Sequence, residues 1–481
     1  RFSLVTGVQT CALPIWHRLQ HQKQNKHGRW IPAHEKGGNE YMGKLTFKGG
    51  IHPYEGKELA KNHPIEKYLP KGDMAYLMSQ HIGAPSVPCV KKGDQVLAGQ
   101  KIADAGGFVS VPLHASVSGT VKGIEKRLNA TGAMIDAIIV ENDQQYQEVE
   151  FTPAKLEDLT KEEILNRIKE GGVVGMGGAG FPTHVKLAPK DPSKIEYVLV
   201  NGAECEPYIT SDYRRMMEEP EKVVEGLKVI LKLFDSAKGY ICIEDNKPDC
   251  IEKMQKLVKD IPRIEVKELM TKYPQGGERT LIYATTGREI NSKMLPADIG
   301  CVVDNVETVV AVYKAVIQGR PVMDRVVTVT GDGIKEPKNF SVYTGTDMSE
   351  LIDAAGGLKA KIEKIISGGP MMGFPLYDLH IPCTKTTSAF LFLENDAVAE
   401  AQKIQTACIN CGRCVGVCPG HVLPARLATL AERGDMAGFE ALDGMECCEC
   451  GCCSYICPAK RPLTQSIKSM RKMVLASRKK K

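Results

Sequence analysis

The sequence lacks three features that would each assign it to a class of protein. It has no run of the ~18 uninterrupted apolar residues that a membrane-spanning helix needs, because Asp304, Glu307 and Lys314 interrupt even its most apolar stretch, 300–317. Aromatic residues make up only 6% of the chain, which argues against an aromatic platform that stacks nucleic-acid bases. The 63 basic and 58 acidic side chains leave a net charge of +5, too small for a field that attracts nucleic acid. We therefore expect no nucleic-acid partner, and only peripheral contact with a membrane.

Cysteine is plentiful but confined to one region. Ten of the 17 cysteines fall between Cys408 and Cys457, so they form a local cluster rather than a disulfide framework spread over a secreted chain. This distribution predicts a reducing, cytoplasmic environment.

Residues 1–41 have no sustained helical or strand period, and 5–15 look like a translated sequencing adapter. We expect 1–41 to be a non-native or disordered leader, with the native chain starting at Met42. A secretory signal is the competing interpretation, but the segment lacks a basic cluster followed by a continuous apolar stretch.

Hydrophobic patterning divides the rest of the chain into four regions, a multidomain α/β and α+β organisation. Residues 42–150 are an N-terminal region in which 87–123 contain short Val/Ile runs between glycine turns. These runs predict a barrel-sandwich-like β module, similar to carrier domains but without a lysine in the hairpin at 109–115. Residues 151–324 alternate helices (163–169, 221–234, 248–258) with strands (197–200, 239–243), which predicts an α/β domain with a mostly parallel sheet. Residues 325–393 predict a small α+β module with one helix at 348–355, and 394–481 a helical, cysteine-rich domain.

The strongest signal is a duplicated cysteine motif. Residues 408–419 and 447–458 both have the C-x2-C-x2-C-x3-C-P spacing of bacterial two-cluster ferredoxins, in which the fourth cysteine of each motif ligates the other cluster. The predicted ligands are Cys408, Cys411, Cys414 and Cys457 for a first [4Fe–4S] cluster, and Cys447, Cys450, Cys453 and Cys418 for a second, with Cys448 and Cys452 left over. Structural zinc is the alternative, but zinc sites usually pair two C-x2-C units across a loop.

A glycine loop is the second signal. The loop 172–183 contains G-x-G-x-x-G at Gly175, Gly177 and Gly180, which alone fits a tight turn as well as a nucleotide site, and Pro182 departs from the dinucleotide fingerprint. Residues 201–207 follow a predicted buried strand, where ligands sit in open α/β sheets, although a charged turn also fits. Asn305 lies at the start of a predicted amphipathic helix. It is either an ordinary N-cap or part of an anion site at the amino end of that helix.

Four segments occur in the order found in the FMN- and NADH-binding subunit of respiratory complex I, which they resemble: 175–186, 201–207, 273–278 and 305–308. The resemblance implies that 151–324 is a Rossmann-like FMN/NADH-binding α/β domain. It also implies flavin contacts from the glycine loop, and acidic groups near the flavin or nicotinamide. The implied residues are Gly175, Gly177, Gly178, Gly180, Lys186, Asn201, Gly276 and Asn305, with Glu204, Glu206 and Glu278 as the acidic groups. The sequence departs at Met176, Ala203 and Gly277, where that subunit has arginine, aspartate and glutamate.

The two ends of the chain resemble the RnfC subunit of the Rnf ion-translocating electron-transport complex. The similar segments are 45–53, the carrier-like module without its lysine, 368–373 and 461–465, so the resemblance covers the chain from Met42 onward. It implies a β-grasp (SLBB-like) module at 325–393 and a two-[4Fe–4S] ferredoxin-type domain at 394–481.

The function implied is that of an oxidoreductase and translocase subunit of the ferredoxin:NAD⁺ oxidoreductase type. FMN would convert between a hydride and single electrons, with no side chain needed as a catalyst. The implied partners are NAD(H), ferredoxin or a ferredoxin-like subunit, and membrane subunits that move Na⁺ or H⁺. The chain would lie peripherally on the cytoplasmic side of the inner membrane.

Two alternatives remain at this point. A soluble flavin and iron–sulfur cobalamin reductase would share the flavin core and both clusters, although the start at 48–53 argues against it. A non-catalytic electron-wiring subunit would keep the fold but not nucleotide binding, and Ala203 and Gly277 are the only hints of it.

Overall fold

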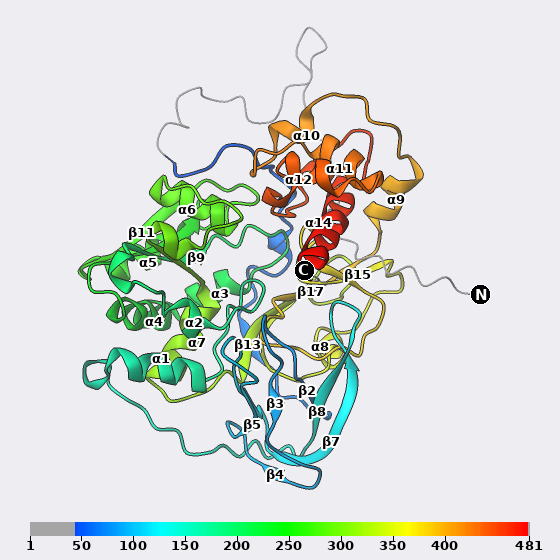
Figure 1. The fold of residues 1–481 in the computed structure, drawn as a ribbon. Coiled ribbons are helices and arrows are strands. Elements are labelled where there is room, and N and C mark those ends of the chain that lie inside the picture. The colour runs from blue at the N-terminus through cyan, green and yellow to red at the C-terminus, as the bar shows by residue number, and fades with distance from the viewer. Residues whose placement is uncertain (1–43, 480–481) are drawn as a thin grey trace.

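Four groups of helices and strands follow one another along the chain in the order that the sequence predicts (Figure 1). The computed structural model describes residues 44–479, so the leader predicted at 1–41 and the start at Met42 lie outside the described residues. Within 44–479, no helix is both long and apolar enough to cross a membrane.

The first group is a β module of two small sheets that share one core. Met74, Tyr76, Ile102, Val121 and Ile138 are buried between the sheets, as alternation of apolar residues along short strands requires. One sheet has the order β2-β8-β7-β4, with β2 Met74–Leu77, β4 Gln95–Val96, β7 Gly119–Leu128 and β8 Met134–Asn142. The other has the order β3-β5-β6, with β3 Val87–Pro88, β5 Lys101–Asp104 and β6 Leu113–His114.

The N-terminal region also contributes a strand to the third group. A short helix η1 (Lys57–Leu59) precedes β1 (Ile65–Lys67), and β1 pairs in parallel with β14 (Lys338–Tyr343) of the third group. Alternation within a strand does not specify which distant strand it will join, so this pairing could not be predicted from the pattern.

The second group confirms the predicted parallel sheet. Its strands β9 (Tyr197–Gly202), β10 (Lys238–Glu244), β11 (Ile264–Leu269) and β12 (Cys301–Asn305) are all parallel, in the order β11-β10-β9-β12. The helices are α1 Lys161–Glu170, α2 Thr183–Lys186, α3 Ser211–Glu218, α4 Pro220–Lys232, α5 Pro248–Val258, α6 Glu278–Thr286 and α7 Val306–Val316. The short helix η2 (Leu156–Asp158) precedes α1, and η3 (Pro192–Lys194) and η4 (Pro296–Ile299) lie between later elements.

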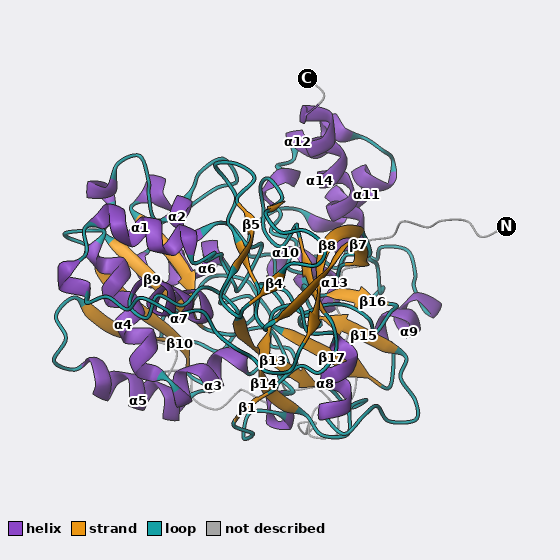
Figure 2. Cartoon of the chain, turned by 90° about the horizontal axis from the view of Figure 1, so that it is seen from below, coloured by secondary structure: helices purple, strands orange, loops and turns teal. Residues whose placement is uncertain are grey.

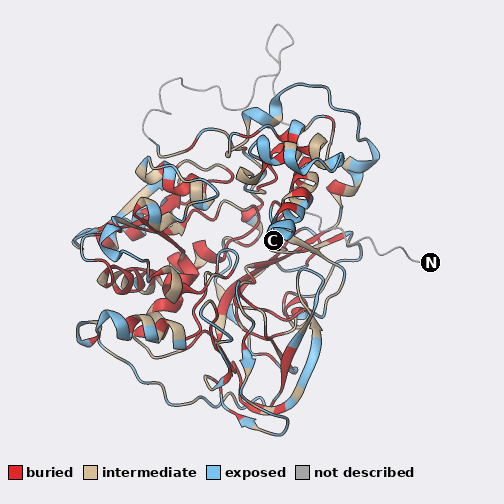
Figure 3. Ribbon diagram, viewed as in Figure 1, coloured by how far each residue is buried: buried red, intermediate tan, exposed pale blue. Residues whose placement is uncertain are grey.

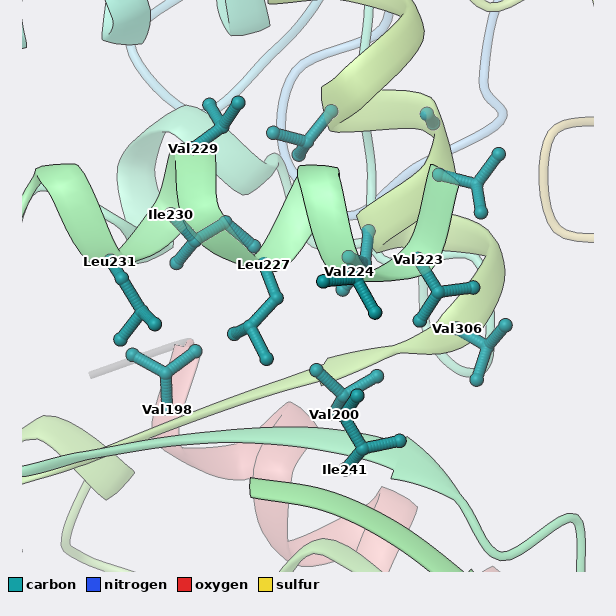
Figure 4. Packing of buried hydrophobic residues seen from close by; sticks show 14 of the residues in the cluster. Val198, Val200, Val223, Val224, Leu227, Val229, Ile230, Leu231, Ile241 and Val306 are labelled. Carbon is teal, nitrogen blue, oxygen red and sulfur yellow. The ribbon is translucent and has the colours of Figure 1, made fainter. Parts of the chain in front are cut away.

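Apolar residues three and four apart hold α4 on this sheet. Figure 4 shows Leu227, Ile230 and Leu231 of α4 pointing toward Val198 and Val200 of β9, and all five are buried. Each buried side chain of this size contributes roughly 1.5–3 kcal/mol. The helices therefore fix the positions of the strand ends.

The third group is a mixed sheet with one main helix. Its order is β1-β14-β13-β17-β15-β16, and β13 pairs antiparallel with β14 but parallel with β17. The bounds are β13 Asp324–Thr330, α8 Met348–Ala354, β15 Lys364–Ser367, β16 Phe374–Leu376 and β17 Ala389–Leu393. Met348, Leu351 and Ile352 of α8 belong to the buried core of this group, so the predicted α+β module is confirmed.

The fourth group is helical, and α11, α12 and α14 gather at one end of the molecule (Figure 2). Its elements are α9 Ala397–Lys403, α10 Arg413–Gly416, α11 Pro424–Glu432, α12 Met436–Ala441, η5 Gly444–Glu446, α13 Cys452–Ile456 and α14 Leu463–Lys479. Leu427, Phe439, Leu463, Ile467 and Met470 form its core, and Cys414, Cys418, Cys447 and Cys457 pack against them.

Candidate functional site

Two asparagines at the carboxyl ends of neighbouring strands organise the first site. Asn201 of β9 and Asn305 of β12 are register partners. Asn201 Nδ2 donates to the Gly276 carbonyl oxygen (2.8 Å), and the Gly276 N–H donates to Cys205 Sγ (3.2 Å). The turn before α6 is thereby held against the end of β9, which is the edge where ligands bind in such sheets.

Asn305 is both an N-cap and a link to another element. Its Oδ1 accepts from the Glu307 N–H (2.9 Å), which caps α7, and its Nδ2 donates to Asp212 Oδ2 (2.7 Å). The N-cap interpretation is therefore confirmed. The side chain has a second role, because its Nδ2 also links α7 to Asp212 of α3.

The glycine loop lies across the start of α7. The Met176 N–H donates to Thr308 Oγ1 (2.9 Å), and a Cβ on Gly177 would lie 2.6 Å from Asn305 Cβ, so only glycine fits there. A Cβ on Gly178 would meet no atom of the described chain within 4 Å. Gly177 thus packs inward on the protein, while Gly178 presents open backbone.

The remaining loop residues complete the same edge. The Gly175 N–H donates to the Phe181 carbonyl oxygen (2.9 Å), and Gly180 has φ +72° where the loop passes Gln80 of the β module. Helix α2 is a single turn.

Lys186, the last residue of α2, lies next to the strand end. Its Nζ contacts Asp304 Oδ1 and the Val303 carbonyl oxygen, both at 2.8 Å. Burial raises the pKa of Glu278 at the start of α6, and nearby Lys186 lowers it. The structure therefore brings Gly177, Asn305, Lys186 and Glu278 to one edge of the sheet.

Glu204 and Glu206 make their hydrogen bonds away from the glycine loop. Glu204 Oε1 accepts from the Asp212 N–H (2.7 Å), at the start of α3. Glu206 Oε1 accepts from the Met371 and Met372 N–H groups (2.6 and 3.1 Å), in the segment 368–373 of the third group. Burial raises the pKa of Glu206 to about 7. Both glutamates thus tie the turn 204–209 to other elements.

A buried lysine that sequence reasoning missed supports the same turn. Lys57 Nζ donates to the carbonyl oxygens of Glu204 (2.8 Å), Glu206 (3.1 Å) and Ile209 (2.6 Å). Nothing in the sequence distinguishes Lys57 from its neighbour Lys61. Only the fold reveals its role.

The two cysteine motifs have the same backbone. Asn410 and Glu449, Gly412 and Gly451, and His421 and Lys460 all have positive φ, and each pair is related by the same offset as Cys408 and Cys447. Turns of this kind turn successive N–H groups toward one point, where they stabilise negative charge such as that of an iron–sulfur cluster. The duplication seen in the sequence is thus a duplication of structure.

Most of the predicted ligand thiols lie near one another. Cys418, Cys447, Cys450 and Cys453 line one cavity, together with the leftover Cys448 and Cys452. For the first set, burial raises the pKa of Cys414, and the nearby thiols of Cys457 and Cys411 raise it further, so a cysteine of the second motif lies beside the first.

The donor set fits a cluster better than a single ion. Among residues 44–479, no three His, Cys, Asp or Glu side chains converge tightly enough to hold one metal ion. A cubane with its own sulfides keeps its thiolates farther apart than a single ion does. All eight predicted ligands are free cysteines, which suits two [4Fe–4S] clusters.

A direct contact joins the two sites. Tyr273 precedes the Gly276 turn, and its hydroxyl donates to the Cys450 carbonyl oxygen (2.8 Å). Residues 45–57, which we call the strap, run between them: Ile51 pairs with Tyr273, and the Gly50 N–H donates to the Val417 carbonyl oxygen (2.9 Å). The strand edge and the second cluster cavity are therefore neighbours.

The chain matches four family models in succession. They are the RnfC barrel sandwich hybrid domain (45–145), the Nuo51 FMN-binding domain (168–314), the SLBB domain (326–375) and the 4Fe-4S binding domain (401–423). It is 45% identical over 440 residues to the RnfC subunit of the Na⁺-translocating ferredoxin:NAD⁺ oxidoreductase complex of Acetobacterium woodii, covering 90% of this chain and 98% of that protein. The chain belongs to the RnfC family.

Further RnfC relatives agree with this assignment. The one from the proton-translocating ferredoxin:NAD⁺ oxidoreductase complex of Clostridium ljungdahlii is 45% identical over 391 residues, which cover 81% of this chain and 85% of that protein. The one from the ion-translocating oxidoreductase complex of Vibrio cholerae is 38% identical over 83% of this chain and 52% of that protein. An NAD⁺-reducing [NiFe]-hydrogenase has a TM-score of 0.44 at 20% identity, over 68% of this chain and 63% of that chain.

The matches confirm the family and the cofactor classes predicted from sequence. The FMN-binding model spans every residue of the predicted flavin set, from Gly175 to Asn305. The 4Fe-4S model covers the first cysteine motif, and the repeated backbone extends the assignment to the second. Because these relatives are subunits of ion-translocating complexes, the family assignment favours the RnfC interpretation over a cobalamin reductase.

Proposed function

We propose that this RnfC chain is the subunit through which its complex exchanges a hydride with NAD(H) and single electrons with partner proteins. When bound, FMN accepts two electrons as a hydride and passes them on one at a time. The observation that carries the proposal is the hydrogen bond from Tyr273 to Cys450, because it joins the Gly276 turn to the second cluster cavity. We call the proposed flavin site, at the strand ends that carry Asn201 and Asn305, the flavin edge.

The chain's own residues would bind and orient the flavin at the strand edge. The open backbone at Gly178 allows close approach of a flat ring, whereas the turn at Gly276 packs against Cys205 and Asn201. Lys186 supplies a positive charge there, and Glu278 a carboxyl group. Asn201 and Asn305 hold both loops in place, while Glu204 and Glu206 support them from behind.

The two clusters have different access to solvent. Cys450 and Cys453 are buried (8% exposed each), whereas Cys408 and Cys411 lie in a continuous exposed run, 402–413 (Figure 3). We therefore place the second cluster next to the flavin, and the first cluster where a partner can exchange electrons with it. Ile404 and Ile409 add exposed apolar surface for that partner.

The family names extend the proposal to the whole complex. The relatives named above belong to Na⁺- and proton-translocating complexes and share the same 45% identity with this chain, so identity does not select an ion. We assign ion movement to partner subunits, and electron exchange with ferredoxin to the complex as a whole. We place this chain peripherally on the cytoplasmic side of the membrane, where NAD(H) is available.

Two glycine variants test the flavin site. Gly178→Ala adds a Cβ that clashes with no atom of the described chain, so it should not disturb the free protein. A flavin in close contact with that surface would lose about 1–3 kcal/mol of binding free energy. We expect FMN affinity to fall about five- to 150-fold. Gly107→Ala, whose Cβ would make an ordinary 3.4 Å contact in the β module, is the control.

The activity itself is tested by visible absorbance of anaerobically reconstituted protein. NADH should bleach the flavin band first and then the cluster absorbance. A protein that holds FMN and ~8 iron but does not respond to NADH would refute the proposal and favour an electron-wiring subunit.

A further inference from the structure

Three carboxyl groups are buried together behind the flavin edge. Glu204 and Asp212 are each 9% exposed and Glu244 is 1% exposed. Asp212 receives its hydrogen bond from Asn305, so it is the member closest to the proposed flavin site. Such groups are rarely buried without a partner for every oxygen.

One of these oxygens lacks a donor within residues 44–479. Glu204 Oε2 is fully buried and has no hydrogen-bond partner there, although Oε1 accepts from the Asp212 N–H. The closest cation, Lys57 Nζ, is 3.8 Å from Oε2, which is beyond hydrogen-bonding distance. A carboxylate whose buried oxygen lacks a donor is costly, and binding a proton reduces that cost.

The charges around the three groups are these. Glu204 is near the positive charges of Lys57 and Lys247. Asp212 is near Glu204, Glu307 and Arg325. Glu244 is near Lys247, Lys57 and Glu55. Glu307 is paired with Arg215 (2.6 Å), and Lys247 Nζ lies 3.5 Å from Glu244 Oε2. Burial raises the pKa of Asp212 and of Glu244 to about 7 each, and that of Glu204 as well.

A small cavity extends from Glu244 and Lys57 toward the exposed His52, while Glu204 and Asp212 lie outside its lining. It is lined by Lys57, Glu244, Glu55 and His52, among others, and its volume of about 30 Å³ has room for water. His52 is exposed and Glu55 is half-buried, with Asn246 Nδ2 donating to Glu55 Oε2 (2.7 Å). Titratable groups therefore extend from the flavin edge to solvent.

The proposed function, on which this inference rests, leaves one proton to be moved. Oxidation of NADH breaks one C–H bond and gives NAD⁺, one proton and two electrons. The two electrons leave singly and reduce the two clusters by one electron each. The proton then has to leave the flavin edge.

We propose that the Asp212–Glu204 carboxyl pair takes up this proton, and that the cavity beside Lys57 and Glu244 leads it to the surface. When electrons flow toward NAD⁺, the same groups supply the proton. The two groups are coupled, because the charge of Glu204 adds to burial in raising the pKa of Asp212.

Infrared difference spectra of the FMN- and cluster-loaded protein, taken before and after NADH, test the uptake step. We expect a carboxylic-acid C=O band to appear on reduction and to shift in D2O. Glu204→Gln should lose at least half of its intensity, whereas Glu265→Gln, an exposed carboxylate of β11, should leave it unchanged. A band that is absent from the unaltered protein, or that persists in full in Glu204→Gln, overturns the proposal.

A second variant tests the exit route without touching the pair. Glu244→Gln should keep the infrared band but slow the release of one proton per NADH to a pH-sensitive dye at least tenfold. Release at the unaltered rate overturns the route through the cavity. The flavin band separates the two hypotheses: if NADH does not bleach it, the proposed function fails, and if it bleaches without these signals, only this inference fails.

Discussion

Lys57→Met should open the turn behind the flavin edge. The lysine is 6% exposed and its ammonium group donates to three carbonyl oxygens, those of Glu204, Glu206 and Ile209. Methionine keeps most of the volume but leaves these acceptors without their donor. Losing one partner of a buried charged contact costs about 3 kcal/mol or more.

That free energy corresponds to at least about a hundredfold increase in local opening. Amide hydrogen exchange measured on 203–213 reports it directly, with β10 as an internal reference. FMN affinity should fall with it, because the turn joins the end of β9, which carries Asn201.

A lysine four residues further on provides the control. Lys61 Nζ makes one hydrogen bond, to the Asn246 carbonyl oxygen (3.3 Å), and lies over the Tyr213 ring. Lys61→Met should therefore cost about 0.5–1.5 kcal/mol, roughly a tenfold effect at most. If Lys57→Met changes exchange in 203–213 no more than Lys61→Met does, the reasoning about the buried ammonium is wrong.

Three further changes have definite outcomes. Cys450→Ser should lose about half of the ~8 iron, whereas Cys448→Ser should keep it all, as iron and sulfide analysis will show. Tyr273→Phe removes the donor to the Cys450 carbonyl, so protease release of the cysteine-rich domain should be faster by the equivalent of about 1–3 kcal/mol; exposed Tyr283→Phe is the control. Burial lowers the pKa of His114 from 6.5 to about 3, so the unfolded chain binds more protons between these values and stability falls as the pH is lowered. The loss is up to about 1.4 kcal/mol per pH unit, and His114→Gln should reduce the Tm difference between pH 6.5 and 5.

The sequence was most informative where a feature is local. Helix α5 is predicted at its observed bounds because Pro248 can start a helix and Ile251, Met254 and Val258 repeat at helical spacing. The cysteine spacing likewise depends on residues a few positions apart. Asn305 was identified as an N-cap because capping is a property of one turn.

Features that depend on distant residues could not be predicted in this way. Lys57 reads like any surface lysine, and only the folded chain puts three carbonyl groups around it. The partners of Glu206 lie in the third group, and β1 pairs with a strand far along the chain. A glutamate in a turn can face a ligand or support a loop, and the amino-acid type alone does not distinguish the two roles.

The strap changes which parts of this protein can be exchanged as units. A truncation or domain swap with its boundary at β2 would keep both sheets of the β module, although the sheet of the third group would lose its edge strand β1. It would still remove Gly50 from Val417, Ile51 from Tyr273 and Lys57 from the turn 204–209. In a chimaera of two RnfC proteins, the first residues of the described chain should therefore come from the same parent as both the flavin domain and the cysteine-rich domain.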